Sequence, residues 1–191
     1  MVKYVNAKKF FLNFIFYSIV GWIYEIFLEV VVYRWGYMPR EFFRGPICPI
    51  YGFGAIVLIL FFYKYSKKTN INIVKRLLIV FIGSIILTSL IELIASYVFE
   101  LKTGTWPWRT GYLKYIVNLN GRIALSTSIR FGLISLLCIF LIHRAYDNFM
   151  NMLIKKKLFN LFFYIILVLF LLDFIFAYIF PTNVNLDIKR A

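Results

Sequence analysis

The sequence has few charged residues and very few acidic ones. Only 16% of its 191 residues are charged, with 8 Asp and Glu against 22 Lys and Arg. In soluble domains about a quarter of the residues are charged. Hydrophobic residues make up 62% of the chain, more than a water-soluble core can hide. With 10 Gly and 5 Pro, the chain is not collagen-like or of low complexity. These shortages predict an integral membrane protein.

Cysteines and catalytic signatures are scarce as well. Cys48 and Cys138 are the two cysteines, which excludes a disulfide framework, and no CxxC pair is present. The sequence has no HExxH, GxSxG or Walker A motif and no cluster of metal ligands with a known spacing. The single histidine, His143, is expected at the membrane interface. These absences favour a protein that is not an enzyme, and we predict no catalytic residue, cofactor or metal.

Long apolar runs are what the sequence has in abundance. Five of them are long enough to cross a bilayer, which takes about 20 helical residues. They are Phe10–Tyr33, Pro46–Tyr65, Leu77–Phe99, Ile123–Ile142 and Leu158–Phe180. The alternating pattern of a membrane β-barrel is absent, which leaves helices. The sequence predicts an all-α membrane protein: residues 1–191 form a single polytopic domain, a bundle of five transmembrane helices with structured outer loops.

The basic residues are placed between the apolar runs. A net charge of +14 would otherwise suggest nucleic acid as a partner. Here the Lys and Arg lie mainly in the connecting segments, so the predicted partner is the lipid bilayer and not nucleic acid. Segments on the N-terminal side of the membrane hold more of them than the opposite segments. The positive-inside rule therefore predicts a multi-pass protein of the cell membrane with its N-terminus cytoplasmic and its C-terminus outside.

Charged residues also occur inside the predicted spans: Glu25, Glu29, Glu92, Arg130 and Asp173. Under that topology all except Glu29 lie roughly 10–12 Å below the outer boundary, at 1.5 Å per helical residue. This agreement predicts one polar layer in the outer half of the bundle. In one interpretation, Arg130 pairs with Glu25 or Glu92 and only holds the helices together. In another, the surplus acids face water or bind a proton, a metal cation or a cationic small molecule. In a third, they are neutral and hydrogen-bonded to Ser18, Ser89 or Ser96.

Two outer loops are rich in Gly, Pro and aromatic residues. The Gly45-Pro46 pair, followed by Pro49 and Gly52, predicts irregular or re-entrant backbone. Residues of both loops are candidates for a cap over the polar layer: Arg44, Cys48, Tyr51, Asn118, Asn120 and Arg122. We expect Arg44 and Arg122 to stay at the rim of such a site and to pair with Glu41 or Glu100.

Three motifs carry a family resemblance. In chain order they are Gly21-Trp22-Ile23-Tyr24-Glu25, the run from Arg44 to Gly54, and Asn118-Leu119-Asn120-Gly121-Arg122-Ile123. On these residues the chain resembles the bacterial family called Putative ABC-transporter type IV, or CmpB-like permease, over roughly residues 21–132. Relatives commonly carry a Trp-Trp-Asp-Tyr-Ser segment, whereas Trp106-Pro107-Trp108-Arg109-Thr110 here has no acid.

The resemblance implies transport, and three functions stay open. The first is a permease-like transport component that works with a separate ATPase or another membrane subunit, or as a homo-oligomer. The second is a non-catalytic assembly or sensing partner, in which the polar layer only specifies packing. The third is a membrane enzyme acting on a lipid or envelope precursor. In that case Glu25 or Glu92 would be the general base, and Arg44 or Arg122 would hold an anionic headgroup.

Overall fold

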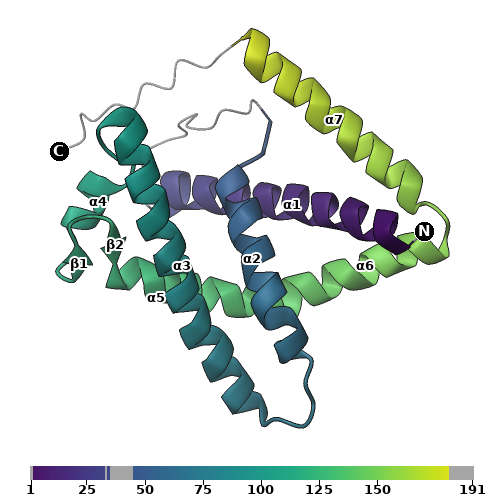
Figure 1. Ribbon diagram of the computed structural model, residues 1–191, viewed down its shortest axis with the longest axis horizontal. Helices are drawn as coiled ribbons and strands as arrows, with labels where there is room; N and C mark the ends of the chain where they lie inside the picture. The colour runs from purple at the N-terminus through teal and green to yellow at the C-terminus, as the bar shows by residue number, and fades with distance from the viewer. Residues whose placement is uncertain (1, 33, 35–44, 181–191) are drawn as a thin grey trace. The chain divides into compact units, whose positions relative to one another are not determined.

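The computed structural model of the protein describes residues 2–32, 34 and 45–180. The helices are α1 (Val2–Ile26), α2 (Pro49–Ser66), α3 (Ile73–Thr103), α4 (Arg109–Leu113), α5 (Leu125–Leu137), α6 (His143–Lys155) and α7 (Phe159–Ile179) (Figure 1). A π-helical segment, η1 (Phe27–Val32), continues α1, and another, η2 (Cys138–Ile142), joins α5 to α6. The strands β1 (Asn118–Leu119) and β2 (Ile123–Ala124) pair antiparallel as a short hairpin.

Five of these helical stretches are long and apolar enough to cross a membrane. They are Ala7–Val32, Pro49–Ser66, Ile73–Thr103, Leu125–Lys155 and Phe159–Ile179. Large apolar side chains on them are widely exposed, as Leu60 and Leu141 show at 67% each. Such exposure suits a protein whose solvent is lipid, because lipid tails are as apolar as these side chains. The predicted all-α membrane fold with five spanning helices is confirmed.

The fourth spanning helix is longer than its apolar run. The prediction ended it at Ile142, but the helix continues through α6 to Lys155. The added part is strongly amphipathic: Tyr146, Met150 and Leu153 recur at helical spacing and are all buried. A search for unbroken apolar runs stops at the first charges of α6, although one apolar face is enough to fold it as a helix.

The second spanning helix begins later than predicted. It starts at Pro49 instead of Pro46, and proline is well suited to the first helical position because the N–H it lacks would have no intrahelical partner. Residues 45–48 lie outside the helix: the chain bends at Gly45 and Pro46, and the Ile47 N–H donates to the Gly45 carbonyl at 2.8 Å. Irregular backbone was predicted here and is present. It does not extend to Gly52, which lies in regular helix.

The described residues form two compact units. The first unit takes its described residues from Met1–Val57 and Ala145–Asn185, and the second from Leu58–Arg144. In the core of the first unit, the buried face of α6 packs with Leu12 and Phe159. The ring of Phe16 stacks on Tyr146 with their centres 4.3 Å apart. This packing fixes the start of α7 against α1 within the unit.

The second unit is built mainly on the contact between α3 and α5. Its core centres on Leu58, Val80 and Ile139. Gly132 on α5 lets the two helices approach, because a Cβ there would lie 2.7 Å from Cγ1 of Ile85 on α3. The hairpin and α4 connect α3 to α5. This unit therefore places the loop side chains over the same two helices that carry Glu92 and Arg130.

Candidate functional site

The five charged side chains of the spans are divided between the two units. Glu25, Glu29 and Asp173 belong to the first unit, and Glu92 and Arg130 belong to the second. The single layer that would contain all five stays a prediction, as does the pairing of Arg130 with Glu25 or Glu92.

In the first unit, Glu25 on α1 accepts a hydrogen bond from the hydroxyl of Tyr51 on α2. The helices come this close because Gly21 has no side chain: a Cβ there would overlap the side chain of Tyr51. Gly52 lies against Ser18 of α1 in the same way. Small residues commonly allow such approaches between membrane helices. The glycines of two sequence motifs thus bring the Tyr51 phenol to the Glu25 carboxyl.

Cys48 and Glu29 are buried in the first unit, with 2% and 5% of their surface exposed. The backbone N–H of Cys48 donates to the carbonyl of Ser18 at 3.1 Å, which ties the segment before α2 to α1. Cys48 and Tyr51 therefore belong to the packing between α1 and α2, and their role as a cap stays a prediction. Arg44, another predicted cap residue, lies outside the described residues.

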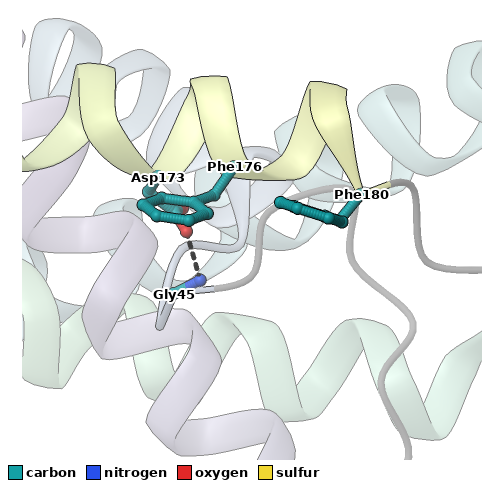
Figure 2. Close-up of a pocket in the computed structure, with 4 residues that line it drawn as sticks. All are labelled: Gly45, Asp173, Phe176 and Phe180. Carbon is teal, nitrogen blue, oxygen red and sulfur yellow. Dashed lines mark hydrogen bonds between the residues drawn. The ribbon is translucent and has the colours of Figure 1, made fainter.

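Asp173 on α7 is held by the segment that precedes α2. Its Oδ1 accepts the backbone N–H of Gly45 at 2.6 Å (Figure 2). The backbone approaches closely here: a Cβ on Gly45 would lie 3.1 Å from Cγ of Asp173, a tighter contact than most Cβ atoms make. The second oxygen, Oδ2, is buried and has no hydrogen-bond partner. The carboxyl of Asp173 is thus only half satisfied by the protein.

In the second unit, two tyrosines bind the charged side chains of the spans. The Tyr112 hydroxyl donates to Oε1 of Glu92 at 2.5 Å, and Nη2 of Arg130 donates to the Tyr115 hydroxyl at 2.6 Å. The two rings are 6.2 Å apart and nearly perpendicular. Burial and the Glu92 carboxyl raise the pKa of Tyr112, so this phenol keeps its proton and stays a donor. Oε2 of Glu92 is buried without a hydrogen-bond partner.

The polar side chains of α3 face α5 and the hairpin. Oγ of Ser89 lies 2.9 Å from Oγ of Ser128 on α5, and Nη1 of Arg122 donates to Oγ of Ser96 at 3.1 Å. Together with the bond between Glu92 and Tyr112, these contacts give Ser89, Glu92 and Ser96 partners within the second unit.

Arg122 is the centre of the loop structure. Its Nη2 lies 2.6 Å from Oε2 of Glu100, which confirms one of the two partners expected for it. The guanidinium also lies 4.0 Å from the ring centres of both Tyr97 and Trp106. The guanidinium therefore makes an ion pair with Glu100, a hydrogen bond to Ser96 and two cation–π contacts at the same time. The Arg122 side chain is 12% exposed, so the contacts are largely shielded from solvent.

The hairpin turn that presents Arg122 depends on its Asn and Gly residues. Asn120 and Gly121 have positive φ angles of 50° and 67°, which Asn-Gly pairs adopt readily. The Arg122 N–H closes the turn on the Leu119 carbonyl at 2.8 Å, and the Gly121 N–H donates to Oδ1 of Asn118 at 2.9 Å. The predicted cap residues Asn118 and Asn120 thus shape the backbone that carries Arg122.

These local structures are built from the residues that carry the family resemblance. The model of the family described as Putative ABC-transporter type IV matches residues 12–178. The chain belongs to this family. No curated protein and no solved structure matches the sequence. The match exceeds the span of the three motifs and includes α6 and Asp173. Membership of this family of ABC-transporter type and five apolar helices support a component of membrane transport.

Sequence reasoning missed the tyrosines that bind the charged side chains. Tyr112 and Tyr115 were not singled out, and Trp106 and Trp108 were noted as part of the segment that lacks the acid of its relatives. In the structure both indoles donate to the hairpin backbone, to the carbonyls of Gly121 at 2.7 Å and Arg122 at 2.9 Å. One signal was available: the two tyrosines are three residues apart in the loop between the span with Glu92 and the span with Arg130.

Metal ligands do not gather in the part of the chain that the structure describes. Among residues 2–32, 34 and 45–180, no group of three or more His, Cys, Asp or Glu is placed to hold a metal ion. Cys48 and Cys138 are not joined by a disulfide.

Proposed function

We propose that the chain is a permease-like subunit of a membrane transporter, working with a separate ATPase or another membrane subunit. One observation carries this proposal: Glu92 and Asp173 each have one carboxyl oxygen bonded by the protein and the other buried without a partner. A carboxyl inside a span costs about 2.5 kcal/mol or more, and such residues usually mark an ion or substrate pathway. The open oxygens supply acceptors for a proton or a cation in transit.

The proposed orientation has the N-terminus in the cytoplasm and the C-terminus outside the cell membrane. In the first unit, Lys8 donates to Asn160 at 2.8 Å and Lys9 to Asn151 at 3.2 Å. These contacts put the start of α1 beside the corner between α6 and α7, which carries Lys155 and its neighbours Lys156 and Lys157. A cluster of Lys at one membrane face supports a cytoplasmic side.

A second function, a non-catalytic assembly or sensing partner, is favoured by the hydrogen bonds that tyrosines make to two of the span carboxyls. Tyr51 and Tyr112 bind Glu25 and Glu92 as a packing contact would. Buried polar contacts often specify how helices pack without doing more. The two functions differ in whether a solute crosses the membrane.

Flux through proteoliposomes separates them. The purified full chain is reconstituted, and uptake of protons, K⁺ and methylammonium is measured for the parent, Glu92→Gln and Glu25→Gln. We expect flux of at least one probe, reduced by Glu92→Gln, because an amide keeps the bond from Tyr112 but not the charge. If both variants fold and all three proteins leak each probe at the rate of empty vesicles, with and without membrane extract and ATP, the transport proposal fails and assembly stands.

A further inference from the structure

We infer that a pocket beside Asp173 binds a primary ammonium group carried on a short apolar body. The inference rests on the proposed function, for which it names the class of solute, and concerns the first unit alone. The pocket has a volume of about 420 Å³ and is lined by Gly45, Asp173, Phe176 and Phe180. Small-molecule sites range from about 300 to 1,000 Å³.

The lining residues present one carboxyl and two aromatic rings on a single face of α7. Asp173, Phe176 and Phe180 follow the spacing i, i+3, i+7, which puts them on one side of the helix. Figure 2 shows Asp173 and Phe176 directed toward Gly45, with Phe180 further along the same side. The two rings are nearly parallel, at 21°, with centres 6.4 Å apart. An apolar body of a few carbons therefore meets two aromatic side chains beside the carboxyl.

The free oxygen of Asp173 determines the charge and donor type of the ligand. Oδ1 is used by the Gly45 N–H, whereas Oδ2 is buried with no hydrogen-bond partner. A buried carboxyl oxygen without a donor is costly, and a cationic N–H donor removes that cost with a charge-assisted hydrogen bond. Phenylalanine faces also attract cations within about 6 Å. Both features favour an ammonium ion over a neutral or anionic ligand.

Divalent metal ions fit the pocket poorly. Ca²⁺ takes six to eight oxygen ligands and Mg²⁺ needs nearly ideal octahedral geometry. Among the residues that the structure describes, the lining supplies one carboxyl, one glycine backbone and two aromatic rings. An organic monocation needs one anionic acceptor and an apolar wall, which is what these four residues offer.

Two sources can deliver this chemistry. Asp173 lies six residues before the end of α7, about 9 Å along the helix. At that depth the ammonium can belong to the headgroup of an ethanolamine lipid or to a free alkylamine. The group recognised is the same, so the two sources are separated by the lipid in which the protein is studied.

Binding of butylammonium to the full chain in detergent tests the inference. We expect butylammonium to raise the apparent melting temperature in a saturable manner, and n-butanol at equal concentration not to. Asp173→Asn keeps an acceptor for Gly45 and removes the charge, and should weaken binding about 10- to 100-fold. Asp147→Asn is the matched control, because Asp147 lies on α6 and does not line the pocket. It should bind as the parent does.

A second variant and two lipid compositions complete the test. Phe176→Leu replaces an exposed ring and should weaken binding several-fold even if Asp173→Asn does not fold.

In nanodiscs, phosphatidylethanolamine should abolish butylammonium binding if the lipid headgroup fills the pocket, while phosphatidylglycerol should preserve it. Equal binding in both lipids identifies the free amine as the ligand. Binding without flux would reject transport and leave the site. No binding to the parent in detergent or phosphatidylglycerol, or equal binding by Asp173→Asn, overturns the inference.

Discussion

Replacing Arg122 should destabilise the protein more than replacing any other basic residue in the segment between α3 and α5. Its ion pair with Glu100 is short, but the Glu100 side chain is 40% exposed, which limits the pair to about 1 kcal/mol. Two cation–π contacts add about 0.5–1 kcal/mol each. The bond to Ser96 brings the total for Arg122→Leu to about 2–4 kcal/mol, allowing for non-additivity.

The conservative variant sharpens this prediction. Arg122→Lys keeps the charge, but a single ammonium cannot bond Glu100 and Ser96 while lying flat between two rings. We expect it to lose about half as much stability as Arg122→Leu. Arg109→Leu is the matched control: Arg109 is exposed and only lies 5.1 Å from the Trp106 ring, so its loss should stay within about 0.5 kcal/mol.

The assay is unfolding in mixed detergent and dodecyl sulfate micelles, followed by tryptophan fluorescence. Trp106 and Trp108 both hydrogen-bond the hairpin and so report on it directly. A double-mutant cycle with Glu100→Gln isolates the ion pair. The reasoning is refuted if Arg122→Lys is as stable as the parent, or if Arg109→Leu costs as much as Arg122→Leu.

Two further predictions concern packing and topology. Gly21→Ala should destabilise the protein by about 1–3 kcal/mol, because the new Cβ would overlap Tyr51. Gly54→Ala on α2 is the control: its Cβ would meet nothing within 4 Å, so the change should be neutral or stabilising. Equal effects of the two changes in a denaturant titration would contradict the packing of α1 on α2. In a background without Cys48 and Cys138, an impermeant maleimide applied to intact cells should label single cysteines at Thr103 and Asn185 but not at Asn70. Labelling at Asn70 alone would invert the topology.

The sequence alone was sufficient to predict the number of spanning helices and one contact in a loop. Length and apolar content alone indicate five helices, because lipid requires about 20 apolar residues for each. The contact between Arg122 and Glu100 was expected from charge at the same end of neighbouring segments and is present. The continuation of the fourth span into α6 was not, since its apolar face is visible only at helical periodicity and its other face is charged.

The partners of the buried carboxyls could not be read from the spans because they are phenols. A search for charge complementarity pairs Glu25 or Glu92 with Arg130, a basic residue well inside a predicted span and not near its end. Tyrosine carries no charge and occurs 14 times in the chain, so nothing in the pattern distinguishes Tyr51 or Tyr112 from an interfacial tyrosine. What selects them is backbone geometry: a glycine on α1 in one case, a folded loop in the other.

The choice of phenols has a consequence for how the carboxyls behave. An arginine partner would hold a carboxyl ionised and would resist its protonation. A phenol can donate to the carboxyl oxygen whether the acid is charged or neutral, so the contact between Tyr112 and Glu92 survives a change of protonation. The loop that carries Tyr112 can therefore stay bound to Glu92 whether this carboxyl is charged or neutral. The transport function proposed above would use this tolerance, because a proton or a cation in transit changes the charge state of the carboxyl that binds it.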